Sequence, residues 1–194
     1  MADVWVVTGG IGSGKSTIRR GLEDLGAVTI DADRIGHLVL EPGGAAFDAV
    51  AERWPEAVHD GRIDRSTLGG IVFADREALR ELEALTHPAI GAEIGRQVEK
   101  AGDAVVVVEV SVPKDLVGAG WLQTIVADLP TEERTQRLID RGMEPDDVAR
   151  RMKAQPSRDG WRARGRWIIS TSGSRDEVTE RVRRLWEHVI GDAS

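Results

Sequence analysis

The sequence predicts an α/β fold in three layers, with a five-stranded parallel sheet between helices, and three observations lead to this prediction. A short apolar run at 4–8 ends in a glycine-rich loop that opens a helix. The run 104–109 is mostly valine, which is typical of a parallel strand buried on both faces. Further apolar runs alternate with helical segments, at 27–30, 122–127 and 167–169.

The composition fits one α/β domain and excludes several classes of protein. At 194 residues and 41% hydrophobic content, the chain can bury a sizeable core but is short for two independent domains. It has no cysteine, so disulfides and thiolate metal sites are excluded. The sequence shows no basic leader and no apolar run long enough to cross a bilayer. We therefore expect a cytoplasmic protein without a membrane partner.

Charge is distributed unevenly along the chain. The formal net charge of −7 argues against a general nucleic-acid-binding protein, so no nucleic-acid partner is predicted. Residues 134–166 nevertheless hold ten basic and five acidic side chains, which gives this segment +5 and the rest of the chain −12. A basic flap that faces a polyphosphate explains this segment, and an ordinary solvated helical surface explains it equally well.

These patterns divide one P-loop unit, residues 1–194, into three parts. The long stretch 34–102 is expected to be a helical insertion without strands, broken near 42–44 and 59–61, that carries substrate contacts. The basic segment is expected to form a helical lid. The predicted parts are a nucleotide-binding core of 1–33, 103–133 and 166–194, the insertion of 34–102, and the lid of 134–165.

The glycine-rich loop carries the strongest chemical signal. Residues 9–16 match the pattern G-x-x-x-x-G-K-[ST] between a strand and a helix, a context that a functionless glycine turn seldom reproduces. Its backbone N–H groups can converge on phosphate oxygens beside the positive end of the helix. Lys15 is expected to bridge the β- and γ-phosphates of ATP, and the Ser16 hydroxyl to ligate Mg²⁺. The predicted ATP-binding residues are Gly10, Ile11, Gly12, Ser13, Gly14, Lys15, Ser16 and Thr17.

Two aspartates follow the second predicted strand. Asp31 and Asp33 come at its carboxyl end, where open α/β sheets bind their ligands. A kinase needs a carboxylate to orient the acceptor hydroxyl and to take its proton, and Asp33 is our candidate for this role. The alternative is that both aspartates cap a helix that starts at Arg34. Asp31 suits either role.

Three further residues are candidates with ordinary alternatives. Glu109 ends an apolar strand, as an acid near Mg²⁺ would, although a solvated strand-end acid fits equally well. The pair His87-Pro88 is expected to end a helical stretch, where a neutral turn histidine is the simpler interpretation. Arg141 precedes Gly142, a hinge in the predicted lid, and is our choice for the guanidinium that contacts the transferred phosphoryl group.

Taken together, these segments resemble the dephospho-CoA kinase family along nearly the whole chain. The resemblance rests on these residues: Thr8–Thr17, Leu25-Gly26-Ala27, Ile30–Asp33, Glu41-Pro42-Gly43, Val72–Asp75, Leu85–Pro88, Gln155 and Ser172-Gly173. It implies ATP- and Mg²⁺-dependent phosphorylation of the ribose 3′-hydroxyl of dephospho-CoA. It further implies that Asp33 is the base, that residues 12–17 form the ATP loop, and that the helical insertion and His87 belong to the substrate side. Our own candidates add Lys15 and Arg141 as catalytic residues and Asp31 and Glu109 as substrate-binding residues.

The chain departs from the family pattern at two places. Residues 109–115 replace Asp-x-Pro-Leu-Leu-x-Glu, which leaves open a kinase for another nucleoside, nucleotide or small alcohol. Ser170 and Thr171 replace an Asp-Asn pair near the adenine, which removes an amide able to contact the base. A nucleotide-binding regulator without transfer activity is the remaining alternative. The sequence does not indicate an oligomeric state.

Overall fold

The computed structural model describes residues 2–111 and 123–190, which form two compact units. The first unit contains residues 2–31, 98–111 and 123–190 of this description. The second contains residues 32–97. Within the described residues, no helix is both long enough and apolar enough to span a membrane.

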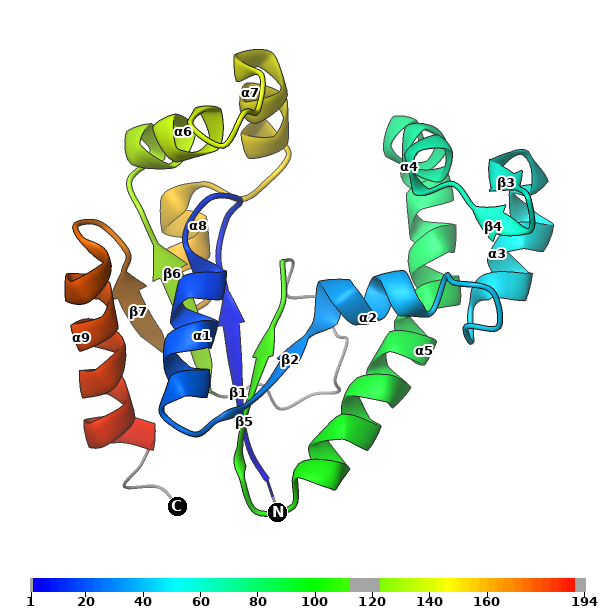
Figure 1. The fold of residues 1–194 in the computed structure, drawn as a ribbon. Helices are drawn as coiled ribbons and strands as arrows, with labels where there is room; N and C mark the ends of the chain where they lie inside the picture. The colour runs from blue at the N-terminus through cyan, green and yellow to red at the C-terminus, as the bar shows by residue number, and fades with distance from the viewer. Residues whose placement is uncertain (1, 112–122, 191–194) are drawn as a thin grey trace. The chain divides into compact units, whose positions relative to one another are not determined.

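The first unit is built on a parallel sheet, which confirms the predicted fold class (Figure 1). Its strands lie in the order β2-β5-β1-β6-β7. Their bounds are Asp3–Thr8 for β1, Val28–Asp31 for β2, Val105–Glu109 for β5, Thr124–Asp128 for β6 and Trp167–Ser170 for β7. Because the chain crosses from one side of β1 to the other between β5 and β6, the topological switch point lies at the carboxyl end of β1.

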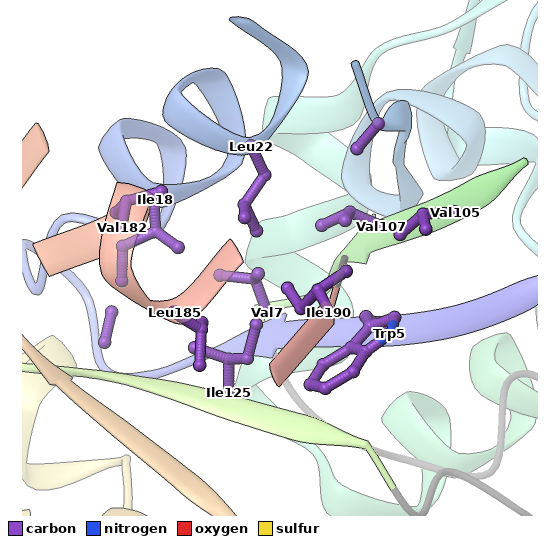
Figure 2. Close-up of a cluster of buried hydrophobic side chains, with 12 residues drawn as sticks. Trp5, Val7, Ile18, Leu22, Val105, Val107, Ile125, Val182, Leu185 and Ile190 are labelled. Atoms are coloured by element: carbon purple, nitrogen blue, oxygen red, sulfur yellow. The ribbon is translucent and has the colours of Figure 1, made fainter. Parts of the chain in front are cut away.

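One face of the sheet packs against two helices, α1 (Lys15–Asp24) and α9 (Arg175–Leu185). Alternate side chains of the strands point to this face, and the helices present apolar residues at intervals of three and four. Figure 2 shows the resulting cluster, in which the π-helical turn η2 (Trp186–Ile190) continues α9. The cluster includes Trp5, Val7, Ile18, Leu22, Val107, Ile125, Val182, Leu185 and Ile190, all of them buried.

The opposite face of the sheet is also buried. Val6, Val106, Val108 and Val126 alternate with the residues of the first face and are at most 2% exposed. Helix α8 (Arg158–Arg162) contacts β6, and Gly165 just after it approaches the side chain of Val126. The sheet is therefore covered on both faces, which explains why β5 consists almost entirely of valine.

Two helices carry the basic segment between β6 and α8. They are α6 (Thr131–Ile139) and α7 (Pro145–Lys153), which contact each other. Gly142 lies between them with a positive φ of 87°. Farther along the chain, Ser174 and Glu177 form the predicted capping box at the start of α9.

The second unit is mostly helical, as predicted, but it contains strands that the sequence analysis did not expect. Its elements are α2 (Ala32–Leu38), α3 (Phe47–Arg53), η1 (Pro55–Ala57), β3 (Val58–His59), β4 (Arg62–Ile63), α4 (Arg65–Ala74) and most of α5 (Arg76–Ala101). Strands β3 and β4 pair antiparallel around Asp60 and Gly61, which both have positive φ. An Asp-Gly pair with these angles favours a tight hairpin turn, so the predicted break joins two strands.

Two predicted helix boundaries are wrong. Helix α5 does not end at His87-Pro88 but continues through Pro88 to Ala101. Proline removes one backbone hydrogen bond from a helix. Thr86, Ile90 and Ile94 around it are buried, and this packing holds the helix together across the missing bond. Helix α2 begins at Ala32 rather than Arg34, so Asp31 directly precedes the helix and Asp33 lies in its first turn.

Replacing Leu22 by alanine should lower the free energy of unfolding by about 3 kcal/mol, because the side chain is fully buried between α1 and the sheet. Urea denaturation monitored by circular dichroism measures this change. Leu38, which is 52% exposed, is the control, and its alanine variant should differ from the parent by less than about 0.5 kcal/mol. Equal losses in the two variants would contradict the assignment of Leu22 to the core.

Candidate active site

The loop between β1 and α1 lies at the switch point of the sheet. Gly14 precedes the first residue of α1 and has a φ of 91°, which favours glycine. Gly14, the N-cap residue, has no side chain to cap the amino end of α1. The first N–H groups of a helix have no partner within the helix, so those of Lys15 and Ser16 suit an anion. The geometry is that of a phosphate-binding loop.

Lys15 and Ser16 contact different parts of the surrounding structure. The Lys15 ammonium donates to the Gly9 carbonyl at 3.1 Å and so lies back over the loop. The Ser16 hydroxyl donates to Oε1 of Glu109 at 2.9 Å. With its proton engaged by Glu109, the Ser16 oxygen can offer a lone pair to a cation.

Glu109 is buried at the carboxyl end of β5, with 7% of its surface exposed, so the alternative of a solvated strand-end acid is wrong. Arg19 donates from Nε to its Oε2 at 2.9 Å and also binds Glu23 and Thr29. A buried carboxylate needs such a partner, because an unpaired charge is costly away from water. The sequence analysis missed Arg19, although it lies on α1 one turn after Lys15.

Asp31 lies beside Glu109 in the sheet. The two residues are paired in the register of β2 and β5, each at the carboxyl end of its strand. The structure therefore brings Lys15, Ser16, Asp31 and Glu109 of the predicted site to one edge of the sheet in the first unit. Asp33 and His87 lie in the second unit, where Asp33 is exposed and His87 is half-buried. Their assigned roles stay predictions.

Two residues of the basic segment hold Ile11 in the loop. Gln155 accepts a hydrogen bond from the Ile11 N–H at 2.8 Å, and Arg134 donates from Nε to the Ile11 carbonyl at 3.0 Å. Arg134 is 4% exposed, and its guanidinium occupies the space where a side chain at Gly10 would lie. Burial lowers the pKa of Arg134, but an arginine remains protonated at neutral pH. The basic segment is thus attached to the phosphate loop.

Thr171 supports the loop from the other side. Its hydroxyl donates to the Ser13 carbonyl at 2.5 Å, and its side chain packs against Gly14. Arg137 donates to the Thr171 carbonyl at 3.2 Å, which links α6 to the same point. The phosphate loop is therefore held by side chains from 123 to 158 positions farther along the chain.

A family model described as dephospho-CoA kinase matches residues 4–177. The chain belongs to the dephospho-CoA kinase family. A dephospho-CoA kinase of Thermobifida fusca is 38% identical over 189 residues, which cover 94% of both chains. One of Corynebacterium diphtheriae is 36% identical over 192 residues, which cover 93% of this chain and 94% of that one.

Solved structures agree with this membership. The match to the dephospho-CoA kinase of Campylobacter jejuni covers 100% of both chains, with a TM-score of 0.72 and 25% identity. The crystal structure of TT1252 from Thermus thermophilus has a TM-score of 0.83 at 28% identity, and it covers 100% of this chain and 98% of that one. The resemblance and the fold class predicted from the sequence are both confirmed.

The two departures from the dephospho-CoA kinase pattern have different outcomes. In the first departure, at 109–115, residues 112–115 lie outside the described residues. At the second, Thr171 has its hydroxyl engaged by the loop and is 2% exposed. This side chain supports the phosphate loop, which is a role that the sequence analysis did not assign to it.

The basic residues of the lid segment have several different partners. Arg158 binds Asp128 through two bonds of 2.8 Å, and Arg162 binds the same carboxylate at 2.6 Å. Arg150 and Arg151 both bind Asp147 on the surface of α7. These four arginines are therefore paired with carboxylates of the chain itself, and the orientation of the segment toward a ligand stays a prediction.

Arg141, our choice for the transferred phosphoryl group, follows the end of α6 and is exposed. Its N–H donates to the Leu138 carbonyl at 3.2 Å. The neighbouring Gly142 has a positive φ, which is typical of a helix C-terminus, and its role as a hinge stays a prediction. The contact of Arg141 with phosphate stays a prediction.

Asp128 anchors α8 at the carboxyl end of β6. It is 5% exposed, and the hydrogen bond from Arg158 lowers the pKa of its carboxyl group, with Arg162 acting in the same direction. The sequence held a signal for this residue, because Asp128 ends an apolar strand just as Glu109 does.

Replacing Gly14 by alanine should weaken ATP binding roughly tenfold, because the new methyl group meets Thr171 and disturbs the loop. Isothermal titration calorimetry measures the change. Gly26, at the other end of α1, also has positive φ, but a methyl group there would meet no atom within 4 Å. Gly26→Ala should therefore lower stability by about 1 kcal/mol and leave ATP binding unchanged. Equal losses of affinity would refute the role of the Gly14–Thr171 contact.

Replacing Asp128 by asparagine should lower the free energy of unfolding at pH 7 by about 2 kcal/mol, because two arginines lose a buried carboxylate. The folded-state pKa of Asp128 is depressed, so its stabilisation is present above the ordinary aspartate pKa and disappears as the pH falls through the folded value. Urea denaturation of parent and variant should show nearly the same difference at pH 7 and pH 5 and a smaller one at pH 3. Asp140 is exposed directly after α6, and Asp140→Asn should show little difference at any pH.

Proposed function

We propose that this protein transfers the γ-phosphate of Mg-ATP to the ribose 3′-hydroxyl of dephospho-CoA. Membership of the dephospho-CoA kinase family supports the acceptor. The observation that carries the proposal is the loop itself, in which Lys15 and the amino end of α1 adjoin the buried pair of Ser16 and Glu109. A site for nucleotide binding alone would not require a carboxylate at that serine.

The residues around Ser16 fit a magnesium ion. Mg²⁺ prefers oxygen ligands and is usually bound by one or two protein groups together with substrate phosphates. Among the described residues, no group of three or more acidic, histidine or cysteine side chains could form a complete metal cage. Ser16 would ligate Mg²⁺ directly, and Glu109 would hold the hydroxyl proton away from the ion. The bound ion would neutralise charge on the β- and γ-phosphates.

The proposed transfer gives each predicted catalytic residue a role. The 3′-hydroxyl oxygen of the acceptor bonds to the γ-phosphorus, and Asp33 accepts the proton of that hydroxyl. The bond between the γ-phosphorus and the ADP oxygen breaks. Lys15 and Arg141 stabilise the negative charge that develops on the phosphoryl and leaving oxygens. Asp31 and His87 contribute to holding the acceptor. Products are ADP and coenzyme A.

The decisive experiment is a coupled assay of ADP release with and without dephospho-CoA, with the phosphorylated product identified by mass spectrometry. Asp33→Asn should lower kcat roughly 100-fold or more, because the acceptor loses its base. Lys15→Ala should lower kcat/KM for ATP by about the same factor. ATP binding without any release of ADP on addition of dephospho-CoA would reject the proposal in favour of a nucleotide-binding protein or another acceptor.

Asp48→Asn is the matched control for Asp33. Both aspartates are exposed in the first turn of a seven-residue helix, Asp33 in α2 and Asp48 in α3. The Asp48 variant should keep the parent kcat, since a change of helix-terminal charge alone has only a small effect on stability. A comparable loss in both variants would mean that the effect comes from removing a helix-terminal charge and not from losing a base.

A further inference from the structure

Two separate parts of the lid segment bind a single residue of the phosphate loop. Arg134, in α6, donates to the Ile11 carbonyl, and Gln155, just after α7, accepts from the Ile11 N–H. These atoms belong to the two peptide groups on either side of the Ile11 Cα atom. Holding both groups fixes the orientation of Ile11 in the loop.

The position of Ile11 makes this attachment important. It lies between Gly10 and Gly12, and glycine has more backbone freedom to lose than any other residue. The Ser13 N–H donates to the Gly10 carbonyl, so the turn that contains Ile11 is closed within the loop. Anchoring Ile11 therefore restrains the flexible residues whose N–H groups must converge on phosphate.

Gln155 is suited to connect this loop with the lid. Its side-chain oxygen accepts the loop N–H, while its own N–H donates to the Met152 carbonyl at the end of α7. A change in the position of α7 would thus move the Gln155 side chain and, through its hydrogen bond, Ile11. The neutral amide accepts this bond without placing a negative charge beside the bound phosphates.

We propose that Gln155 is a positioning residue for phosphate binding, acting through the Ile11 peptide group. It holds the loop in the shape that receives the triphosphate and couples that shape to the carboxyl end of α7. This inference rests on the proposed function only in that the bound ligand is a nucleoside triphosphate. It does not depend on the acceptor.

The test replaces Gln155 by leucine, which keeps the size of the side chain and removes the acceptor. Titration calorimetry with ATP and with inorganic tripolyphosphate should give Kd values about tenfold higher for both ligands. In turnover, KM for ATP should rise while KM for dephospho-CoA stays at the parent value. Amide hydrogen exchange should become faster in the peptide that contains Ile11.

Two further variants make the test specific. Gln155→Glu keeps an acceptor oxygen, so hydrogen exchange at Ile11 should be close to the parent rate. Its added negative charge should still weaken the binding of phosphate ligands. Gln136 is an exposed glutamine on α6 whose amide donates to Asp140, the residue directly after that helix. Its leucine variant should bind both ligands as the parent does.

Several results would overturn the inference. These are Kd values within twofold of the parent in Gln155→Leu, an equal loss in Gln136→Leu, or a loss of affinity without faster exchange at Ile11. Tripolyphosphate binding needs no acceptor, so failure of the two proposals can be told apart. A protein that shows the affinity shift but does not phosphorylate dephospho-CoA would refute the proposed function and uphold the role of Gln155.

Discussion

The phosphate loop must hold a run of glycines in one conformation while leaving its N–H groups directed toward a ligand, and the rest of the first unit is arranged around this constraint. The loop cannot hold itself, because glycine loses the most backbone entropy on ordering. Hydrogen bonds between its backbone and the side chains of Arg134, Gln155 and Thr171 supply the missing restraint. The sheet places all three beside the loop by putting β1 at its centre.

Buried charge is handled by local pairing at two strand ends. Glu109 has Arg19 and Ser16 as partners, and Asp128 has Arg158 and Arg162. Each carboxylate ends an apolar strand, where burial would be costly without such partners. The two buried carboxylates have different roles. Glu109 binds the serine that is proposed to ligate Mg²⁺, and Asp128 attaches α8 to the sheet.

Much of the architecture could be predicted from local patterns. The valines of β5, the glycines after β1 and the capping box at Ser174 each have a periodicity or spacing with a physical cause. The errors arose where a residue has two uses. Pro88 usually ends a helix but lies within α5, because packing on both sides holds the helix together. The pair Asp60-Gly61 marked a break, yet it forms the turn of a hairpin that only the pairing of β3 with β4 reveals.

The sequence by itself determined the phosphate loop, the parallel sheet and the likeness to dephospho-CoA kinases, because short motifs and strand periodicity depend on neighbouring residues. Only the tertiary structure decided which side chains hold that loop. Arg134, Gln155 and Thr171 lie between 123 and 158 positions from their partners, and no local pattern records such contacts. The same holds for the burial of Glu109, since the partner strands and Arg19 reach it only when the sheet has formed.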